Sequence, residues 1–358
     1  MRPISQIAER ALSRNVFAFW SKDRARRDEF ARCLTTRDTI HLCPRVMIDH
    51  VRATQPRSRV VALEDMPDKD TFLKLHALVG VDTQLIMEGT ARYTKIDSPH
   101  FRCLHALRKL TRHRYLIDVV PFTRAIPKLY LPLSYLDREI LQYPNGYAFQ
   151  YNHAEMDDSG RIRHSHDLDL LAEKVAPWSH LDDAAFLPPL EFVDVPMTPS
   201  EHAKYQEEKE RLFEKWDNPR KIVTDLCDAA NLMPSRRGVL LNLLPSLGRT
   251  AVYTCIGRNS DLLRRHAKKA GHDNATFTTY MVHDGRRIEA DTVVFYETPL
   301  NANQVSAVDV LADIAPGARL LYFRCDAKAD CYLFGEVFPG WQAMDDFTRA
   351  LAAQQEAA

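Results

Sequence analysis

Short apolar runs alternate with longer amphipathic stretches along most of the chain. An apolar run of about four to eight residues between turn residues is typical of a buried strand, and apolar residues three or four positions apart are typical of a helix. The runs that we expect to be strands are 39–44, 58–64, 83–88, 114–120, 249–256, 275–281, 290–297 and 318–325. Because helical patterns separate them, the sequence predicts an α/β protein with parallel sheets covered on both faces.

Two helices have recognisable start signals. Ser98 and Pro99 fit the N-cap and the first position of a helix over 98–113. Thr198 and Glu201 fit a capping box at the start of a long charged helix. Both signals predict where these helices begin.

Three other helices are expected from periodicity. Residues 4–34 have apolar positions three or four apart and are expected to be helical. A helix over 259–271 is expected to be capped by Asn259 or Ser260. The end of the chain, from residue 345, is expected to be a frayed helix.

The alternation stops between about residues 125 and 200. Turn residues gather at PNG (144–146) and DSG (158–160), which indicates a hairpin or a loop insertion. A chain of 358 residues is also long for one hydrophobic core, so two lobes are expected. The predicted division is 1–135 for the first lobe, 136–218 for an insertion and a linker, 219–340 for the second lobe and 341–358 for a tail helix.

The charge balance is neutral, with 48 Lys and Arg against 48 Asp and Glu. This argues against a histone-like cationic binder, while a local basic groove remains possible. Seven cysteines without a C-x-x-C pair favour a reducing compartment over a disulfide framework or a zinc ribbon. No apolar run reaches the ~18 residues of a membrane span, and no signal-peptide core is present. We therefore expect a soluble, cytoplasmic protein.

Histidines in the middle of the chain are one possible metal site. His153 precedes a pair formed by His164 and His166. No Cys or acidic ligand stands at a recognisable spacing from them, so a polar loop is the expected interpretation. The sequence predicts neither a bound metal nor a cofactor.

Six segments carry a pattern in their order and spacing. They are TIHLCPRVMIDHV (39–51), SPHFRCLHALRKLTRHRYLIDVVP (98–121), IPKLYLPLSYLD (126–137), LPPLEFVDVPMTPSEHAKYQE (187–207), RTAVYTCIGRNSDLLRRHAKKAG (249–271) and EADTVVFYETPLNANQVSAVDVL (289–311). Together they resemble the chromatin-remodeller-like (Swi/Snf-type) branch of superfamily 2 helicases, particularly its small bacteriophage versions. The resemblance runs over roughly residues 15–338 and implies two RecA-like lobes in tandem.

Motors of this kind bind phosphate through a Gly-rich loop with a Lys, followed by a hydroxyl that holds Mg²⁺. The resemblance places this loop within FWSKDRARRDEF (19–30), where Lys22 is a remnant of the phosphate lysine and Asp23 replaces the hydroxyl. Phe19 and Trp20 are expected to occupy the phosphate volume, and Asp23 to repel phosphate. The alternative for Lys22 is a solvated helix lysine.

The acidic pair of such motors is reduced as well. The resemblance places it at Met87, Glu88, Gly89 and Thr90, or one residue later with Ala91 at the end. Either alignment leaves Glu88 as the one carboxylate, and one carboxylate cannot both hold Mg²⁺ and activate water. The alternative is that Glu88 is an ordinary carboxylate at a strand end.

Two further motifs have changed. The T-G-T-P turn corresponds to residues 118–121, where Asp118 has replaced the threonine and only Pro121 is kept. The two arginine positions of the second lobe are Val310 and Asp313. Losing one such arginine lowers the rate about 10³-fold or more. The resemblance therefore implies a pseudo-enzyme that has lost ATP hydrolysis, with a residual ATPase as the alternative.

Basic residues occur in clusters that fit either solvated helix faces or a groove that follows a nucleic-acid backbone. The candidates are Arg45, Arg108, Lys109, Arg112, Arg114, Arg236, Arg237, Arg264, Arg265, Lys268 and Lys269. The expected partner is duplex or branched DNA, in an accessory role to an active helicase, a nuclease or a replication protein of a phage or bacterium. The alternative is a protein-interaction scaffold or regulator that does not contact DNA, because the same cations could meet an acidic protein.

Overall fold

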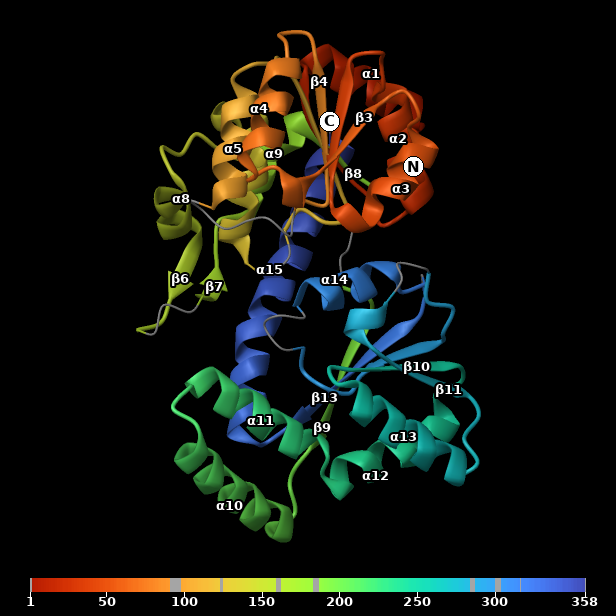
Figure 1. Ribbon diagram of the computed structural model, residues 1–358. Helices are drawn as coiled ribbons and strands as arrows, with labels where there is room; N and C mark the ends of the chain where they lie inside the picture. The colour runs from red at the N-terminus through yellow and green to blue at the C-terminus, as the bar shows by residue number, and fades with distance from the viewer. Residues whose placement is uncertain are drawn as a thin grey trace. The chain divides into compact units, whose positions relative to one another are not determined.

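The computed structural model describes residues 2–90, 98–122, 125–158, 162–182, 187–283, 287–299, 304–315 and 317–357. They form two compact units (Figure 1). Unit 1 comprises Met1–Phe186 and Pro339–Ala358, and unit 2 comprises Leu187–Phe338. Each unit contains its own parallel sheet, so the expectation of an α/β protein with two parallel sheets in tandem is confirmed.

The sheet of unit 1 has six strands in the order β3-β2-β4-β5-β1-β8, and every neighbouring pair is parallel. The strands are β1 (Val16–Trp20), β2 (Thr39–Cys43), β3 (Arg59–Ala62), β4 (Gln84–Glu88), β5 (His113–Asp118) and β8 (Ser179–Leu181). All residues of β1, β2 and β4 are buried, as expected for strands covered on both faces.

Helices cover both faces of this sheet. Figure 1 shows α1 and α2 on one side and α4 and α5 on the other. The helices between the strands are α1 (Ile4–Arg14), α2 (Arg24–Leu34), α3 (Ile48–Thr54), α4 (Lys69–Leu78) and α5 (Pro99–Arg108). Apolar residues of α1 and α2 form one core with β1, β4 and β5. The Ser98 hydroxyl caps α5 by accepting a hydrogen bond from the Phe101 amide, which confirms its predicted start.

The expectation of helix throughout residues 4–34 is wrong, because β1 lies between α1 and α2. Asn15 adopts a left-handed conformation, with φ of 64°, and ends α1. The five residues that follow are apolar and fully enclosed between β5 and β8. A run with no polar position suits a strand buried on both faces, and it cannot form the one-sided surface of an amphipathic helix.

The middle of the chain, expected to be a hairpin or an insertion, folds into helices and one hairpin. Its helices are α6 (Tyr130–Leu136), α7 (Arg138–Leu141), α8 (Gly146–His153) and α9 (Leu168–Val175). Strands β6 (Ala154–Met156) and β7 (Ile162–Ser165) pair in antiparallel fashion. The expected turn at Ser159 and Gly160 lies outside the described residues.

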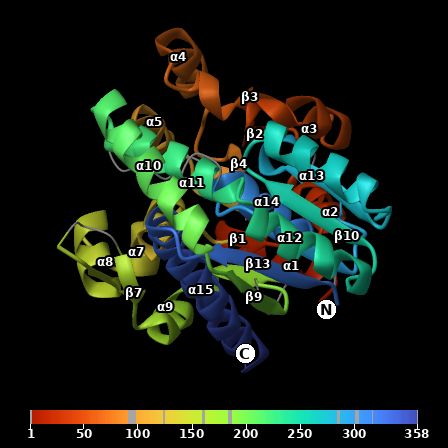
Figure 2. The same cartoon turned by 90° about the horizontal axis from the view of Figure 1, so that it is seen from below.

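The sheet of unit 2 has five parallel strands in the order β11-β10-β12-β13-β9. They are β9 (Leu190–Val195), β10 (Thr250–Thr254), β11 (Ala275–Thr279), β12 (Thr292–Phe295) and β13 (Arg319–Cys325). The helices of this unit are α10 (Pro199–Lys215), α11 (Pro219–Asn231), α12 (Pro234–Leu243), α13 (Gly257–Lys269) and α14 (Gln304–Asp313). Figure 2 shows α12 and α13 beside this sheet, and Leu240 and Leu263 belong to the same apolar core as its strands.

The helix ends of unit 2 were predicted in part. The capping box of Thr198 and Glu201 is present at the start of α10, as predicted. The predicted cap of α13 is wrong, because that helix begins at Gly257 and its N-cap residue, Ile256, provides no side-chain hydrogen bond. Asn259 and Ser260 are instead buried within the first turn.

The predicted frayed tail is wrong. Helix α15 runs from Lys328 to Ala357, and its residues from Pro339 onward belong to unit 1. Phe347 and Leu351 are fully buried there. The Gln355 side chain accepts a hydrogen bond from the Leu181 amide at 3.0 Å. The predicted lobe boundary at 135 is therefore also wrong, since residues up to β8 and the tail complete the first core.

Candidate functional site

The candidate site lies at the carboxyl ends of β4, β5 and β1, which are consecutive strands of the unit 1 sheet. Open parallel sheets bind ligands at this edge. The Ser21 amide donates to the Asp118 carbonyl at 3.1 Å, which joins the turns after β1 and β5. Thr90 Oγ1 donates to Asp118 Oδ2 at 3.3 Å, which joins the turns after β4 and β5. Three of the four expected degenerate motifs therefore meet in one place.

The turn between β1 and α2 contains only Ser21, Lys22 and Asp23. A phosphate loop has eight positions in its signature and offers free backbone N–H groups to the phosphates. Here the Ser21 amide is bonded to Asp118, and the Asp23 amide donates to Ser21 Oγ at 3.1 Å. Two backbone donors of this short turn are therefore used within the protein.

Asp23 occupies the start of α2 as its N-cap. Its Oδ1 accepts from the amides of Ala25 at 2.8 Å and Arg26 at 3.4 Å. Free amides at a helix N-terminus form an anion site, and a capping carboxylate satisfies them. The amides at the start of α2, which could otherwise bind an anion, are therefore satisfied by a carboxylate of the chain itself.

Two arginines of α2 hold the turn in this conformation. The buried Arg27 guanidinium donates to the carbonyl of Ser21 and, at 3.0 Å, to that of Lys22. Arg26 forms a two-pronged ion pair with Asp182, which follows β8, at 2.6 and 2.9 Å. Burial tends to raise the pKa of Asp182, but His180, Arg26 and Ser21 outweigh it and lower that pKa to about 2.

The bulky residues before the turn have a different role from the one expected. Phe19 and Trp20 belong to β1 and are fully buried. The Phe19 ring stacks on Phe30 with centroids 4.5 Å apart. Phe19 belongs to the apolar core that includes Phe30, so the expectation that it occupies the phosphate volume is wrong. Trp20 is buried on the opposite face of the strand. The half-buried Lys22 remains in the turn itself.

Glu88 is the last residue of β4 and is buried. One carboxylate oxygen lies 3.3 Å from His41 Nε2, and the other lies 3.7 Å from Arg24 Nη1. Burial tends to raise the pKa of Glu88, but His41, Arg24 and Arg27 outweigh it and hold the pKa below its usual value. The remaining carboxylate is thus charged and already surrounded by cationic and imidazole side chains.

The rest of the expected acidic segment serves packing. Met87 is fully buried within β4. Gly89 has φ of 70°, and a Cβ there would meet Pro44 Cγ at 2.6 Å. Beyond it, Thr90 bonds to Asp118, whose Oδ1 also accepts from the Val119 amide at 2.9 Å. Buried Pro121 follows in the same turn region.

The two expected arginine positions of unit 2 contribute no positive charge. Val310 is fully buried in α14. Asp313, at the end of that helix, pairs with His283 Nε2 at 2.7 Å. Val310 therefore contributes to the interior of unit 2, and Asp313 forms an ion pair at the end of α14.

Sequence reasoning missed a buried polar network in unit 2. Arg236 donates to the carbonyls of Tyr296 and Phe323 at 3.1 Å and pairs with Asp330 at 3.2 Å. Burial tends to lower the pKa of Arg236, and the Asp330 charge outweighs it and raises that pKa. The candidate nucleic-acid role of Arg236 is wrong, because its side chain is only 1% exposed.

A carboxylate close to this network is also enclosed. Glu297 Oε2 accepts from the Cys255 amide at 2.6 Å, and its Oε1 accepts from Asn259 Nδ2 at 2.6 Å. The same Asn259 amide donates to Asp228 at 2.9 Å. Burial raises the pKa of Glu297. No motif in the sequence links Glu297 and Asp228 to Asn259, from which they are 38 and 31 positions away.

The remaining basic candidates are separated by unit and by role. Arg45 is exposed and pairs with Asp65. Arg237 is half-buried, and four cations of α13 are exposed, namely Arg264, Arg265, Lys268 and Lys269. Among these, Arg264 bonds to Asp261 and to the Phe277 carbonyl, each at 2.7 Å. Arg108, Lys109, Arg112 and Arg114 gather with further residues in one hollow of unit 1.

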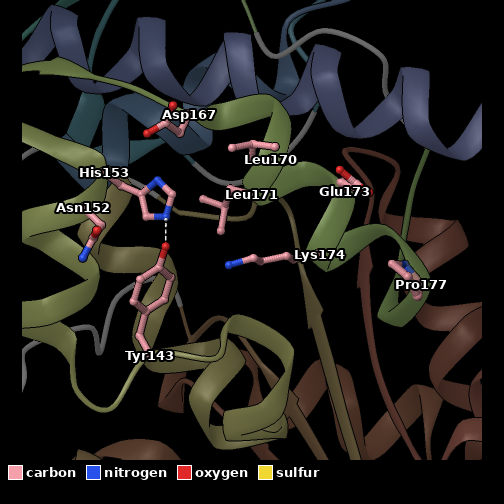
Figure 3. A pocket seen from close by; sticks show the side chains of 9 residues that line it. All are labelled: Tyr143, Asn152, His153, Asp167, Leu170, Leu171, Glu173, Lys174 and Pro177. Atoms are coloured by element: carbon pink, nitrogen blue, oxygen red, sulfur yellow. Dashed lines mark hydrogen bonds between the residues drawn. The ribbon is translucent and has the colours of Figure 1, made fainter.

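His153 lies in a cavity of about 360 Å³ within the insertion, beside Tyr143 and Lys174 (Figure 3). Its Nδ1 faces the His166 carbonyl at 3.2 Å, so Nδ1 carries the proton and Nε2 accepts from the Tyr143 hydroxyl at 2.8 Å. Burial lowers the pKa of His153. Both ring nitrogens are therefore engaged, and the described residues include no group of three or more His, Cys, Asp or Glu placed to hold a metal.

None of the helices in the described part of the chain is long and apolar enough to span a bilayer.

Comparison with known proteins gives structural similarities alone. The sequence matches no protein-family model. No curated protein matches it either. The Sulfolobus solfataricus SWI2/SNF2 ATPase core in complex with dsDNA is similar over 99% of this chain and 93% of its own, at 10% identity and a TM-score of 0.44. S. cerevisiae Dbp5 bound to RNA and ADP BeF3 is similar over 98% of this chain and 93% of its own, at 11% identity and a TM-score of 0.45. Similarity at this level assigns no activity.

Proposed function

We propose that this protein is a helicase-like, nucleic-acid-binding protein that does not hydrolyse ATP and serves a phage or bacterial DNA-processing complex as an accessory subunit. The observation that carries the proposal is the turn after β1. Asp23 caps α2 there with its own carboxylate, at the position where a motor would bind phosphate.

Charge explains why ATP binds poorly to such a turn. Two unit charges about 4 Å apart repel by about 1 kcal/mol in water and by about 4 kcal/mol near a protein surface. A triphosphate would place several negative charges beside Asp23 and would also have to displace its hydrogen bonds to Ala25 and Arg26. Glu88, already flanked by His41 and Arg24, lacks the second carboxylate that metal-assisted hydrolysis requires.

Nucleic-acid binding is supported by the distribution of charge. The chain is neutral overall, yet several exposed cations are clustered on α13 and around the start of β5. Binding of this kind depends on local charge and weakens steeply as salt rises. The retained α/β units and the changed motifs together favour a binding role over a motor role.

Two measurements test the proposal. Isothermal titration with ATP and Mg²⁺ is expected to show no binding, and single-turnover assays no hydrolysis. A shift assay with duplex, forked and single-stranded DNA is expected to show binding at about 50 mM salt that is lost by about 200 mM. Hydrolysis that disappears in both Lys22→Ala and Glu88→Ala would refute the inactive assignment. Absence of binding to every DNA at low salt would refute the nucleic-acid role.

A protein-interaction scaffold is a second candidate, favoured by the insertion. Tyr147 and Tyr151 stand one turn apart on α8 and are 67% and 84% exposed. Exposed tyrosines are frequent among the residues that dominate protein interfaces. This candidate predicts stable co-purification with one protein, insensitive to nuclease and lost in Tyr147→Ala with Tyr151→Ala. Loss of the partner on nuclease treatment would count against it.

A further inference from the structure

A basic hollow of about 490 Å³ lies at the amino ends of β5, β1 and β8, which are consecutive strands of the unit 1 sheet. Residues at the start of β1 and β5 line it, together with Trp178, which precedes β8. The turn capped by Asp23 lies at the other end of β1. Five residues at about 3.3 Å per residue separate the two ends by roughly 16 Å. The hollow is thus distinct from the former nucleotide edge.

Positive charge dominates this hollow. Its lining includes the side chains of Arg14, Arg108, Lys109, Arg112 and Arg114 and one acidic residue, Asp137. The Asp137 carboxylate already faces Arg114, at 3.6 Å. Close cations without matching acids repel one another, so a bound anion would relieve that repulsion.

Two of the arginines form the base of the hollow. Arg114 donates to the carbonyls of Leu136 at 2.7 Å, Thr111 at 2.6 Å and Arg108 at 3.0 Å, and Arg108 donates to the Ser134 carbonyl. Burial lowers the pKa of Arg114, and the neighbouring charge of Arg108 adds to this effect. These two side chains are fixed by the backbone and act as a permanent positive floor.

The other three cations are exposed and can reach a ligand. Lys109 and Arg112 flank the turn that leads into β5. In the portions of the chain that the structure describes, neither side chain forms an ion pair with a carboxylate. The Arg14 guanidinium lies 5.2 Å from the centre of the Trp178 ring. Stacking on an aromatic ring holds a guanidinium flat while its N–H groups remain available to phosphate oxygens.

We propose that this hollow binds the backbone phosphates of a nucleic-acid strand, with Arg14, Lys109 and Arg112 as the phosphate contacts. The assignment rests on the nucleic-acid role proposed above and gives it a location. A positively charged groove with an aromatic side chain is the combination used by proteins that bind nucleic-acid strands along their backbone. Neutralising about three phosphates would give a measurable salt dependence.

The test uses the full-length protein and fluorescence anisotropy with labelled single-stranded and duplex DNA between about 50 and 200 mM salt. The variant Lys109→Ala with Arg112→Ala removes two charges from the hollow. Its matched control, Lys69→Ala with Lys74→Ala, removes two exposed charges from α4 in the same unit. We expect the hollow variant to lose on the order of tenfold in affinity and to lower the salt slope by about 1.4 to 1.8, and the control to change neither.

A second measurement does not depend on charge removal. DNA is expected to change the emission of Trp178, obtained as the difference between the wild-type protein and Trp178→Phe. Circular dichroism checks that each variant is folded. The wild-type protein could bind DNA while the hollow variant keeps the same affinity and the Trp178 emission does not change. That result would refute the hollow assignment and leave the nucleic-acid role intact. If the wild-type protein binds no DNA, the proposed function itself fails.

A free phosphate ligand is the competing occupant. Pyrophosphate is therefore titrated against bound DNA at matched ionic strength. We expect weak displacement, because a strand makes several contacts at once. Complete displacement at micromolar pyrophosphate, abolished by Lys109→Ala with Arg112→Ala, would assign the hollow to a small phosphate ligand and overturn the nucleic-acid assignment.

Discussion

Replacing Arg236 by methionine tests the buried network of unit 2 directly. The change leaves the Asp330 carboxylate, 2% exposed, without its cation and removes the donors to the Tyr296 and Phe323 carbonyls. Breaking a buried ion pair by removing one partner costs about 3–5 kcal/mol. A unit of this size is stable by about 5–15 kcal/mol, so the expected loss of about 4 kcal/mol is a large part of the total.

Urea denaturation followed by circular dichroism measures this loss. With a slope of about 2 kcal/mol per molar urea, the midpoint of the unit 2 transition should fall by about 2 M. The control is Arg237→Met, one position along α12, whose half-buried side chain lies outside the network. Combining Arg236→Met with Asp330→Asn should cost less than the sum of the single changes, because the unpaired charge is then removed.

The reasoning would be refuted if Arg236→Met destabilised the unit by less than about 1 kcal/mol, or no more than Arg237→Met. The same variants also separate structure from binding. Under conditions in which Arg236→Met remains folded, its affinity for DNA should equal that of the wild-type protein, because the side chain is buried.

Three further changes have defined outcomes. Gly89→Ala should destabilise unit 1 by about 1–3 kcal/mol in urea melts, because φ is 70° and the new Cβ would meet Pro44 Cγ at 2.6 Å; an unchanged midpoint would contradict this. The pKa of Asp182 is lowered to about 2, so its ion pair with Arg26 should stabilise the protein fully above about pH 4 and progressively less as the pH falls towards 2. The difference in melting temperature between the wild-type protein and Asp182→Asn should therefore shrink between about pH 4 and pH 2. Asp23→Ala should cost about 1 kcal/mol through loss of the α2 cap, seen as a lower melting temperature, without creating ATP binding by titration calorimetry; tight ATP binding would show that the cap alone excludes phosphate.

The strands expected from apolar runs are present, and those buried on both faces, such as β2 and β4, leave a continuous apolar signal in the sequence. β1 was not predicted, because its short apolar run lies between two amphipathic helices and was assigned to them. It also failed at β8, whose three residues are too few to form a pattern. The C-terminal end of α15 is held by contacts with residues more than 170 positions away, such as that of Gln355 with Leu181. Contacts of this range leave no local pattern in the sequence.

The sequence named residues that lie at the candidate site, but it did not predict the contacts that these residues make. The structure brings Glu88, Asp118 and the turn at Lys22 to one edge of one sheet. That Asp23 caps α2 was not predicted, because the length of the turn depended on the missed strand. Arg236 and Arg237 are indistinguishable in sequence, and a rotation of about 100° around the helix separates a buried cation from a half-buried one.

Because the turn after β1 is short, point substitutions alone cannot convert it into a phosphate-binding loop. A phosphate-loop signature has six positions before its lysine, whereas only Ser21 stands between the end of β1 and Lys22. Point substitutions alter side chains but cannot supply about five missing backbone amides. A version that binds ATP through such a loop would require an insertion that also releases Arg27 from the Ser21 and Lys22 carbonyls. An engineer seeking an ATP-responsive version should therefore graft a whole loop, since no combination of single-residue changes at this turn would suffice.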